Sequence, residues 1–315
     1  MRRNIRYFIT GLFLLCGIFP TKGRILSHSM LSPEEYPIRS VWPNYGLSTK
    51  QRYFSEYSED YIHWSLSAVH SKVSDINDIE QVKELVFAES FLERIFAIQV
   101  LSYKFGKEAL PVIKNSIDDP EPRVRCMAAR MMAILGDKSG FERMRKDIIE
   151  YTQKNKKNDS SSEQNNLSLS MRTRLKRLNH YDAINAAHVL SEFGDSSGFE
   201  LAKQTASNHD NSIIVRVYAI EVLTELERTI DESTLKEQGI EPEAVLIEIA
   251  GSETDTRILQ HLIGFVMNNM KPTSQIRILE KLQESTNSSG TILNSAKRNV
   301  ERSKNQLKLD EQKNN

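Results

Sequence analysis

Apolar residues recur along this chain at the three- and four-residue spacing of amphipathic helices, and the whole pattern returns after about 30 residues. Residues 124–142 and 182–200 align without a gap. Both carry an Ala-Ala pair, an apolar residue four positions after the first alanine, and the closing sequence Gly-Asp-x-Ser-Gly-Phe-Glu. The first alanine of the pair is named the anchor alanine, and its copies are Ala97, Ala128, Ala186 and Ala219. A repeat of this length is typical of stacked helical units, so the pattern predicts an all-α fold.

Each repeat is expected to form a short first helix and a longer second helix that carries the anchor alanine. A single pair cannot bury its apolar stripe, so consecutive antiparallel pairs are expected to stack as an α-solenoid of about five repeats over residues 78–285. The predicted units cover 78–105, 107–136, the third copy that ends at Gly194, the fourth copy around 215–226, and a weaker fifth at 242–250 with 255–268, while a sixth helix over 274–284 closes the apolar pattern.

The turns between helices have their own residue pattern. Two prolines in Asp118-Asp119-Pro120-Glu121-Pro122 end one helix, and the acids can cap the next. Gly136 is expected to end that helix in the left-handed conformation. An arginine precedes the anchor position by three residues in four copies, as Arg94, Arg125, Arg216 and Arg257, the last with Gln260 in place of alanine. These arginines are expected to bond backbone or an acid of the adjacent unit, which is a structural role.

The third repeat carries about 26 extra residues. Residues 154–166 contain no apolar side chain, which predicts a disordered insertion at about 152–170, and residues 171–178 are expected to extend the next helix backwards. The region holds the local basic cluster of the chain: Lys154, Lys156, Lys157, Arg172, Arg174, Lys176 and Arg177. Two interpretations stay open, a site for a polyanion or anionic lipid and a solvated loop edge, and the second is favoured.

The first 23 residues contain, in sequence, the basic, apolar and small-residue segments of a secretory signal peptide. Arg2, Arg3 and Arg6 precede an apolar run over residues 7–19, and the small residues Thr21 and Gly23 fit a cleavage site. An apolar run of about 13 residues is short for a bilayer span. Cleavage near Gly23 is expected; an uncleaved anchor and lipidation at Cys16 are the minority alternatives.

Residues 24–77 are expected to form an irregular lead-in followed by a capping helix. The aromatic residues Tyr53, Tyr57, Tyr61 and Trp64 share one helix face. A cap over the open end of the helical stack is favoured over an aromatic ligand platform, because solenoids need such caps. Residues 286–315 are expected to be a polar tail, with an amphipathic helix at 292–309 that either frays or binds a partner.

Charge and composition exclude some classes of function and of structure. The chain has 42 basic and 42 acidic residues, which argues against a nucleic-acid partner, since phosphate binding usually needs a basic face. Its 13 glycines are too few for many glycine-rich turns or strands. With the signal removed, only Cys126 remains, and its place among apolar helix positions favours a small buried hydrophobe over a reactive thiol.

The unit resembles the HEAT-repeat family, and most closely the short HEAT-like repeat named after the bilin lyases of phycobilisomes. The residues that carry the resemblance are Asp119-Pro120-Glu121-Pro122-Arg123-Val124-Arg125, Ala128 and Leu135-Gly136-Asp137. The third copy departs from this pattern, with Asp182-Ala183 in place of Val-Arg. The resemblance covers roughly residues 78–270 and implies the fold much more than a function, because solenoids present many different surfaces.

Candidate chemistry is sparse. The chain has no G-x-S-x-G, P-loop, C-x-x-C or G-x-G-x-x-G motif, and none of its seven histidines is followed by Glu, the metal-binding dipeptide of one enzymatic HEAT-type family, deoxyhypusine hydroxylase. His63 and His70 can share a helix face without a third ligand. No catalytic residue, metal or cofactor is predicted, and the binding residues stay undetermined.

These observations favour a non-enzymatic protein–protein interaction scaffold, exported to the periplasm or cell envelope of a bacterium, with a protein partner and no nucleic acid. Membrane association through an uncleaved N-terminus or a lipidated Cys16 is the minority expectation. The alternatives are a bilin-lyase-like chromophore or cofactor lyase or its subunit, and a membrane-tethered envelope assembly factor. The export signal argues against the lyase, because bilin lyases act on cytoplasmic substrates.

Overall fold

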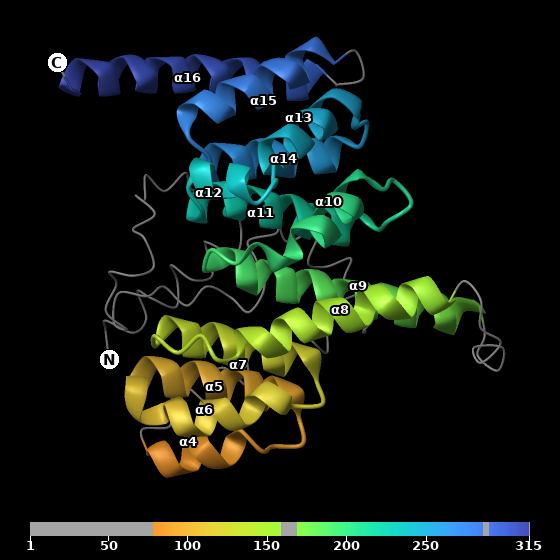
Figure 1. The fold of residues 1–315 in the computed structure, drawn as a ribbon, viewed down its shortest axis with the longest axis vertical. Coiled ribbons are helices and arrows are strands. Elements are labelled where there is room, and N and C mark those ends of the chain that lie inside the picture. The colour runs from red at the N-terminus through yellow and green to blue at the C-terminus, as the bar shows by residue number, and fades with distance from the viewer. Residues whose placement is uncertain (1–77, 159–168, 286–289, 315) are drawn as a thin grey trace. The chain divides into compact units, whose positions relative to one another are not determined.

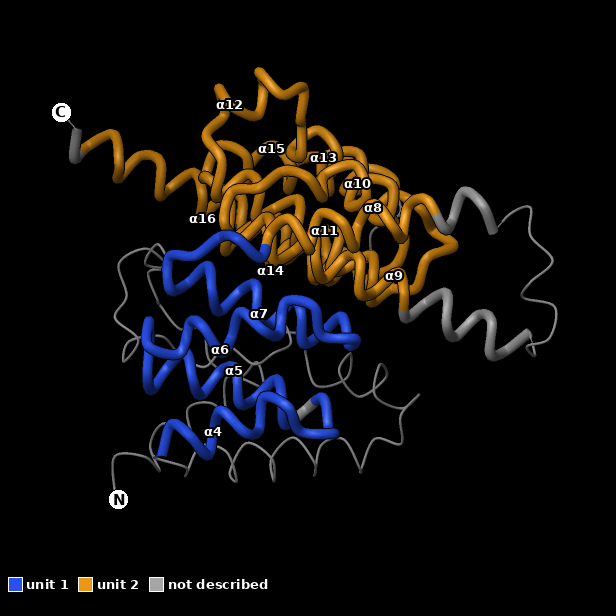
Figure 2. Tube along the Cα trace, turned by 60° about the horizontal axis from the view of Figure 1, so that its bottom comes forward, with its two compact units in different colours: residues 1–140 blue, residues 141–315 orange. Residues whose placement is uncertain are grey.

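The computed structural model describes residues 78–158, 169–285 and 290–314, and these residues form helices joined by turns, without any strand (Figure 1). The predicted all-α class is therefore confirmed. The chain divides into two compact units, residues 1–140 and 141–315 (Figure 2). The predicted signal peptide, the lead-in and the aromatic capping helix lie outside the described residues.

Unit 1 contains two of the expected helix pairs. Its helices are α4 (Ile79–Leu85), α5 (Phe91–Phe105), α6 (Leu110–Lys114) and α7 (Pro122–Ile134). The first helix of each pair packs on its second helix, and α5 also packs on α7. Short 3-10 turns extend α6 at both ends. The core between these helices is made of aliphatic and methionine side chains, among them Ile95, Leu101, Ile113 and Met132.

Unit 2 continues the alternation of helices. Its helices are α8 (Phe141–Asn158), α9 (Leu169–Glu192), α10 (Phe199–Ser207), α11 (Ile213–Thr229), α12 (Glu232–Glu237), α13 (Pro242–Ser252), α14 (Thr256–Asn269), α15 (Pro272–Glu284) and α16 (Gly290–Asn314). α11 is the central helix, since it packs on α9, α10, α13 and α14. The short helix α12 has no counterpart in the sequence prediction.

The anchor alanines are all buried, with at most 1% of any of them exposed. A methyl side chain at this point lets neighbouring helices approach closely, and the larger apolar residue four positions later lies on the same helix face. Met132 and Leu190 occupy that later position and are fully buried. The prediction that these two positions mark the packed face of the second helix is confirmed.

The Gly-Asp step closes α7 and α9 in the same way. Gly136 and Gly194 have positive φ angles of 95° and 78°, which favours glycine at both positions. The next backbone N–H, that of Asp137 or Asp195, then donates to the carbonyl oxygen five residues earlier, at 2.9 and 3.0 Å. The aspartate side chain accepts the backbone N–H of the serine two residues later, Ser139 or Ser197, at 2.8 and 3.0 Å. The predicted glycine C-cap is confirmed.

The second glycine of the closing sequence is needed for a different reason. A Cβ atom on Gly198 would lie 2.4 Å from the Cβ atom of Ala187 and 2.9 Å from its Cα atom. A Cβ atom on Gly140 would lie 3.1 Å from both atoms of Ala129 and 2.7 Å from Ile117. The second alanine of the Ala-Ala pair therefore contacts glycine across the turn, and this contact explains why both small residues recur together.

The anchor position of the fifth repeat is Leu262, two residues after the predicted position Gln260. In the first, second and fourth copies the anchor alanine lies seven residues after the N-cap residue of its helix, as Ala219 does after Ser212. The N-cap residue of α14 is Asp255, so the anchor position is Leu262, which is fully buried, whereas Gln260 is exposed. Arg257 is therefore not the equivalent of Arg94, Arg125 and Arg216. It follows its N-cap residue by two positions, whereas they follow theirs by four.

The predicted insertion at 152–170 is too long. α8 continues to Asn158 and α9 begins at Leu169, so only residues 159–168 lie outside the described part of this region. Lys and Gln are good helix formers, and extending an existing helix needs no apolar residue. The expected backward extension of the following helix through residues 171–178 is confirmed.

Residues 290–314 contain the helix that the sequence predicts at 292–309, but this helix packs within the fold and is not a frayed tail. They form α16, which packs on α14 and α15 and gives α15 a partner. Four buried residues, Ile292, Ala296, Val300 and Ser303, form one stripe along this otherwise polar helix. Ser303 donates a hydrogen bond of 2.6 Å to Gln275 of α15. Such a narrow stripe gives a weak hydrophobic signal, and the polar outer residues suit the last helix of a stack.

We expect Gly198→Ala to lower the free energy of unfolding by about 1–3 kcal/mol, because the added methyl group collides with a buried alanine backbone. Urea denaturation of the purified protein measures the change. Gly264→Ala is the matched control: no atom lies within 4 Å of the new methyl group, so a gain of about 0.5–1 kcal/mol is expected from helix propensity. Equal effects of the two substitutions would refute the glycine–alanine contact.

Candidate functional site

Arginines of the repeat bind the turns before the second helices. Arg94 of α5 makes a bidentate pair with Asp119, at 2.8 and 2.9 Å, and donates to the carbonyl oxygens of Ala88 and Glu89 at 2.9 and 3.0 Å. Asp119 in turn accepts the backbone N–H of Glu121 at 2.8 Å. Arg94 therefore joins the turn before its own helix to the turn before α7, the next second helix.

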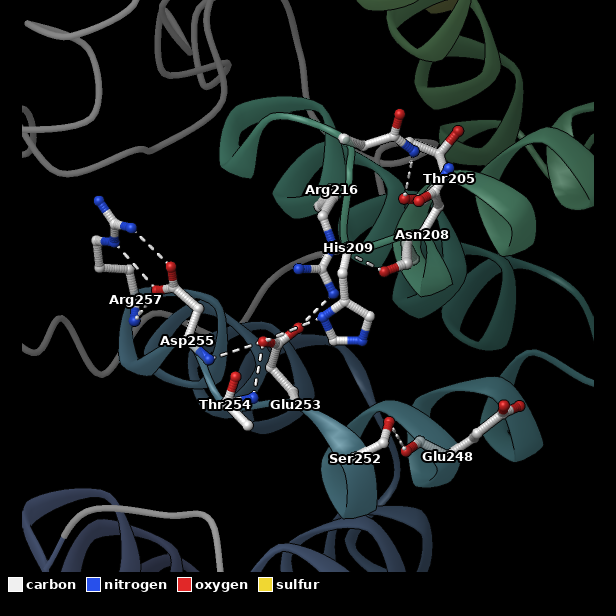
Figure 3. A network of polar contacts seen from close by, with 12 residues as sticks. Thr205, Asn208, His209, Arg216, Glu248, Ser252, Glu253, Thr254, Asp255 and Arg257 are labelled. Atoms are coloured by element: carbon white, nitrogen blue, oxygen red, sulfur yellow. Dashed lines mark hydrogen bonds and ion pairs between the residues drawn. The ribbon is translucent and has the colours of Figure 1, made fainter.

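The same arrangement returns in unit 2 with a different acid. Arg216 of α11 donates to the carbonyl oxygen of Ala206 at 3.0 Å and forms an ion pair with Glu253. Glu253 accepts the backbone N–H groups of Thr254 and Asp255 at 2.8 and 2.7 Å (Figure 3). Asp119 and Glu253 both lie two residues before the N-cap residue of a second helix. We name the pairs Arg94–Asp119 and Arg216–Glu253 the repeat clasps.

The clasps confirm the predicted structural role of Arg94 and Arg216. Arg125 has a related role, since it donates to the carbonyl oxygens of Asp119 and Pro120 at 2.7 and 3.2 Å. Arg257 is different, because it pairs with its own cap residue Asp255 at 2.6 Å on an exposed surface. The sequence did not indicate Glu253 as the acid of a clasp, because the alignment was two residues out of register there and the acid is Glu rather than Asp.

The second clasp is almost inaccessible to water. The side chains of Arg216 and Glu253 are 4% and 1% exposed, and the ring of His209, itself 55% exposed, lies beside them with Nδ1 4.0 Å from Glu253. A buried carboxylate needs donors for both of its oxygens, and here two backbone N–H groups and a guanidinium supply them. The geometry fits a fixed structural joint, because all these partners come from the chain itself.

A second group of buried polar residues lies between α9 and α11. The hydroxyl groups of Tyr181 and Tyr218 are 2.8 Å apart, and their rings meet edge to face at 5.0 Å. His188 places Nε2 at 3.7 Å from Glu221 and 3.9 Å from Glu192. His188 was not a sequence candidate, because it occupies the repeat position of Arg130 and lies in no recognised motif.

A third polar group connects α11, α13 and α15. Glu227 accepts the backbone N–H of Glu243 at 3.1 Å, near the start of α13, and Glu243 binds Arg277 at 2.6 Å and Ser274 at 2.8 Å. Burial raises the pKa of the Glu227 carboxyl above its ordinary value, and the neighbouring charge of Glu243 adds to this. The charged form of Glu227 is thus unfavourable in the folded protein.

The other sequence candidates are dispersed. Cys126 is buried in α7, as expected of a small hydrophobe, and His63, His70 and Cys16 lie outside the described residues. In the described ranges, His, Cys, Asp and Glu side chains do not gather in any group of three that could hold a metal ion. No helix in those ranges has both the length and the apolar content needed to cross a bilayer.

We expect Glu253→Gln to lower the free energy of unfolding by about 3 kcal/mol, because it leaves the Arg216 charge buried without its counter-charge. Asp255→Asn is the matched control two residues away. It removes an exposed ion pair and keeps a good cap residue, so a loss below about 1 kcal/mol is expected. Chemical denaturation of both variants measures the difference, and equal losses would contradict the clasp.

Glu227→Gln should stabilise the protein at neutral pH. The folded protein binds the Glu227 proton more tightly than the unfolded chain does, so ionisation opposes folding at every pH above the folded-state pKa. The advantage of the variant is complete there and disappears as the pH falls into the ordinary Glu range. Denaturation midpoints at several pH values test this. Glu248→Gln, on the exposed side of α13, should show no such pH-dependent gain.

No protein-family model, curated protein or solved structure matches this chain. The resemblance to short HEAT-like repeats therefore stays a prediction that rests on the repeat motif.

Proposed function

We propose that the protein is a HEAT-like α-solenoid that serves as a non-enzymatic scaffold for another protein in the envelope of a bacterium. In this proposal each unit is a run of stacked helix pairs, and the second helices carry the anchor positions. The helical composition of the described residues and the packing of α5 on α7, and of α11 on α9 and α14, support such a stack.

The observation that carries the proposal is the recurrence of the repeat clasps. Arg94 with Asp119 and Arg216 with Glu253 occupy equivalent places relative to the helix caps, and each joins successive turns within its unit. The polar residues that the repeats share are thus engaged in holding the repeats together. The exposed residues of the helices differ from repeat to repeat, and stacked helices of this kind offer an extended surface for a partner.

Site-specific photo-cross-linking in the native envelope tests the scaffold. A photoreactive amino acid is placed singly at exposed positions on first helices, Lys203, Glu248 and Arg277, and on the second helix α14, Gln260 and Asn268. We expect the same partner protein to be captured either from the first-helix positions or from the α14 positions, but not from both. The same probes in an Ala128→Asp, Ala219→Asp background, where a charge replaces each buried anchor methyl group, serve as the unfolded control.

Three outcomes would contradict the scaffold. The partner could be captured equally from the first-helix positions and from the α14 positions, it could still be captured in the unfolded control, or it could not be captured at all. A captured partner that carries a newly attached tetrapyrrole would instead support the lyase alternative.

Export is tested separately by the mass of the mature protein. The order of charged, apolar and small residues in 1–23 predicts a chain that begins at Arg24 when purified from the envelope. A full-length chain in the membrane fraction would mean an uncleaved anchor, and an acylated Cys16 would mean a lipoprotein. Full-length protein in the cytosol would remove the export proposal.

A further inference from the structure

The second helix α5 is enclosed on every side around its anchor alanine. Five consecutive residues are each at most 7% exposed: Ile95, Phe96, Ala97, Ile98 and Gln99. Successive residues of an α-helix are rotated by about 100°, so five side chains in a row point around the whole circumference. The described helices that pack on α5 are α4, α6 and α7.

The equivalent helix α14 shows that three helical neighbours leave part of a second helix open. α14 also packs on three helices, α11, α15 and α16. In its equivalent stretch, residues 260–264, Gln260 is exposed, and His261 and Gly264 are half-buried. These open positions correspond to three buried residues of α5: Ile95, Phe96 and Gln99. The burial of these three residues therefore indicates a cover that α14 does not have.

The covered face continues on α7, the next second helix of unit 1. Cys126 and Met127 take the places of Ile95 and Phe96 and are buried, and Arg130 takes the place of Gln99 and is half-buried. We name these residues the second-helix face of unit 1: Ile95, Phe96, Gln99, Cys126, Met127 and Arg130. The face combines apolar and sulfur-containing side chains with one cation. An occupant that complements it carries large apolar groups and negative charge.

We propose that residues 53–64 of the same chain dock on the second-helix face of unit 1. This segment contains four aromatic residues that recur at helical spacing: Tyr53, Tyr57, Tyr61 and Trp64. Aromatic rings pack well against another ring, as of Phe96, and against the thioether of Met127. The segment also has three acids and neither Lys nor Arg, which complements Arg130: Glu56, Glu59 and Asp60.

The length of the chain that precedes α4 permits this docking. Residues 65–77 join the segment to Asp78, the N-cap residue of α4. A stretch of this length spans up to about 40 Å when extended. The 15 residues of α5 extend over about 22 Å. The segment can therefore return from the start of α4 along the whole of α5.

This docking differs from a cap over the end of the stack, because it places the aromatic residues along the second helices. The chain itself then occupies the second-helix face of unit 1, while the equivalent positions of α14 stay open. The inference goes beyond the scaffold proposal and does not depend on it, since it concerns a contact within one chain.

Photo-cross-linking within the purified protein tests the docking. The photoreactive residue p-benzoylphenylalanine replaces Tyr57 or Tyr61, one at a time, and mass spectrometry identifies the cross-linked peptides. We expect cross-links to peptides that contain residues 95–103 and 126–134. Three results would overturn the proposal: cross-links confined to residues 79–87 of α4, as a cap would give, cross-links between two chains, as a second copy on this face would give, or no cross-links.

A matched pair of charge reversals tests the electrostatic part of the contact. Arg130→Glu places an acid opposite the three acids of the segment, so the yield of cross-links from position 57 should fall about threefold or more. Lys107→Glu is the control, because it reverses an exposed cation of unit 1 outside the second-helix face and should leave the yield unchanged. Equal yields from the two variants would contradict the docking.

Far-ultraviolet circular dichroism checks that both variants keep their helices. If R130E does not fold, R130Q takes its place, and its yield should lie between that of R130E's expected loss and the wild-type yield. A wild-type yield from R130Q would then count against the contact with Arg130.

Discussion

The described fold depends on how a buried guanidinium is neutralised. Arg94 and Arg216 lie in the first turns of second helices, where each donates to backbone carbonyl oxygens and keeps its positive charge, so each needs a carboxylate beside it. Asp119 supplies it for Arg94 and Glu253 supplies it for Arg216. Because each acid also binds the backbone N–H of the next N-cap residue, its position determines where the next second helix begins.

Around these joints the helices are packed by small residues and long apolar ones. The anchor alanines and the glycines at 140 and 198 permit close approach, and residues such as Met132, Leu190 and Leu223 fill the space between helices. Buried polar side chains pair with one another, as Tyr181 does with Tyr218 and Gln275 with Ser303. The apolar contacts supply most of the stabilisation. The polar contacts select one register of helix against helix.

The sequence predicted the helical class, the positions of most helices and the role of Gly136, because periodicity and caps are local signals. It failed where the signal is not local. Four small or apolar positions on α16 become a packed face only beside α15. The acid at Glu253 is recognised only from the caps in the structure. His188 lies between two carboxylates because α9 and α11 are adjacent, and nothing in its own neighbourhood of the sequence indicates this.

The repeat clasps also define what can be exchanged between repeats. The acid that binds an arginine belongs to the following turn, so the heritable module does not coincide with a helix pair. It runs from the acid, through the second helix and its arginine, to the residue before the next acid. A duplication or loss in that phase leaves Arg94 and Arg216 each with a carboxylate. A break between one of these arginines and its acid removes the counter-charge of that guanidinium, whereas extra residues elsewhere, such as those of the third repeat, leave both pairs intact.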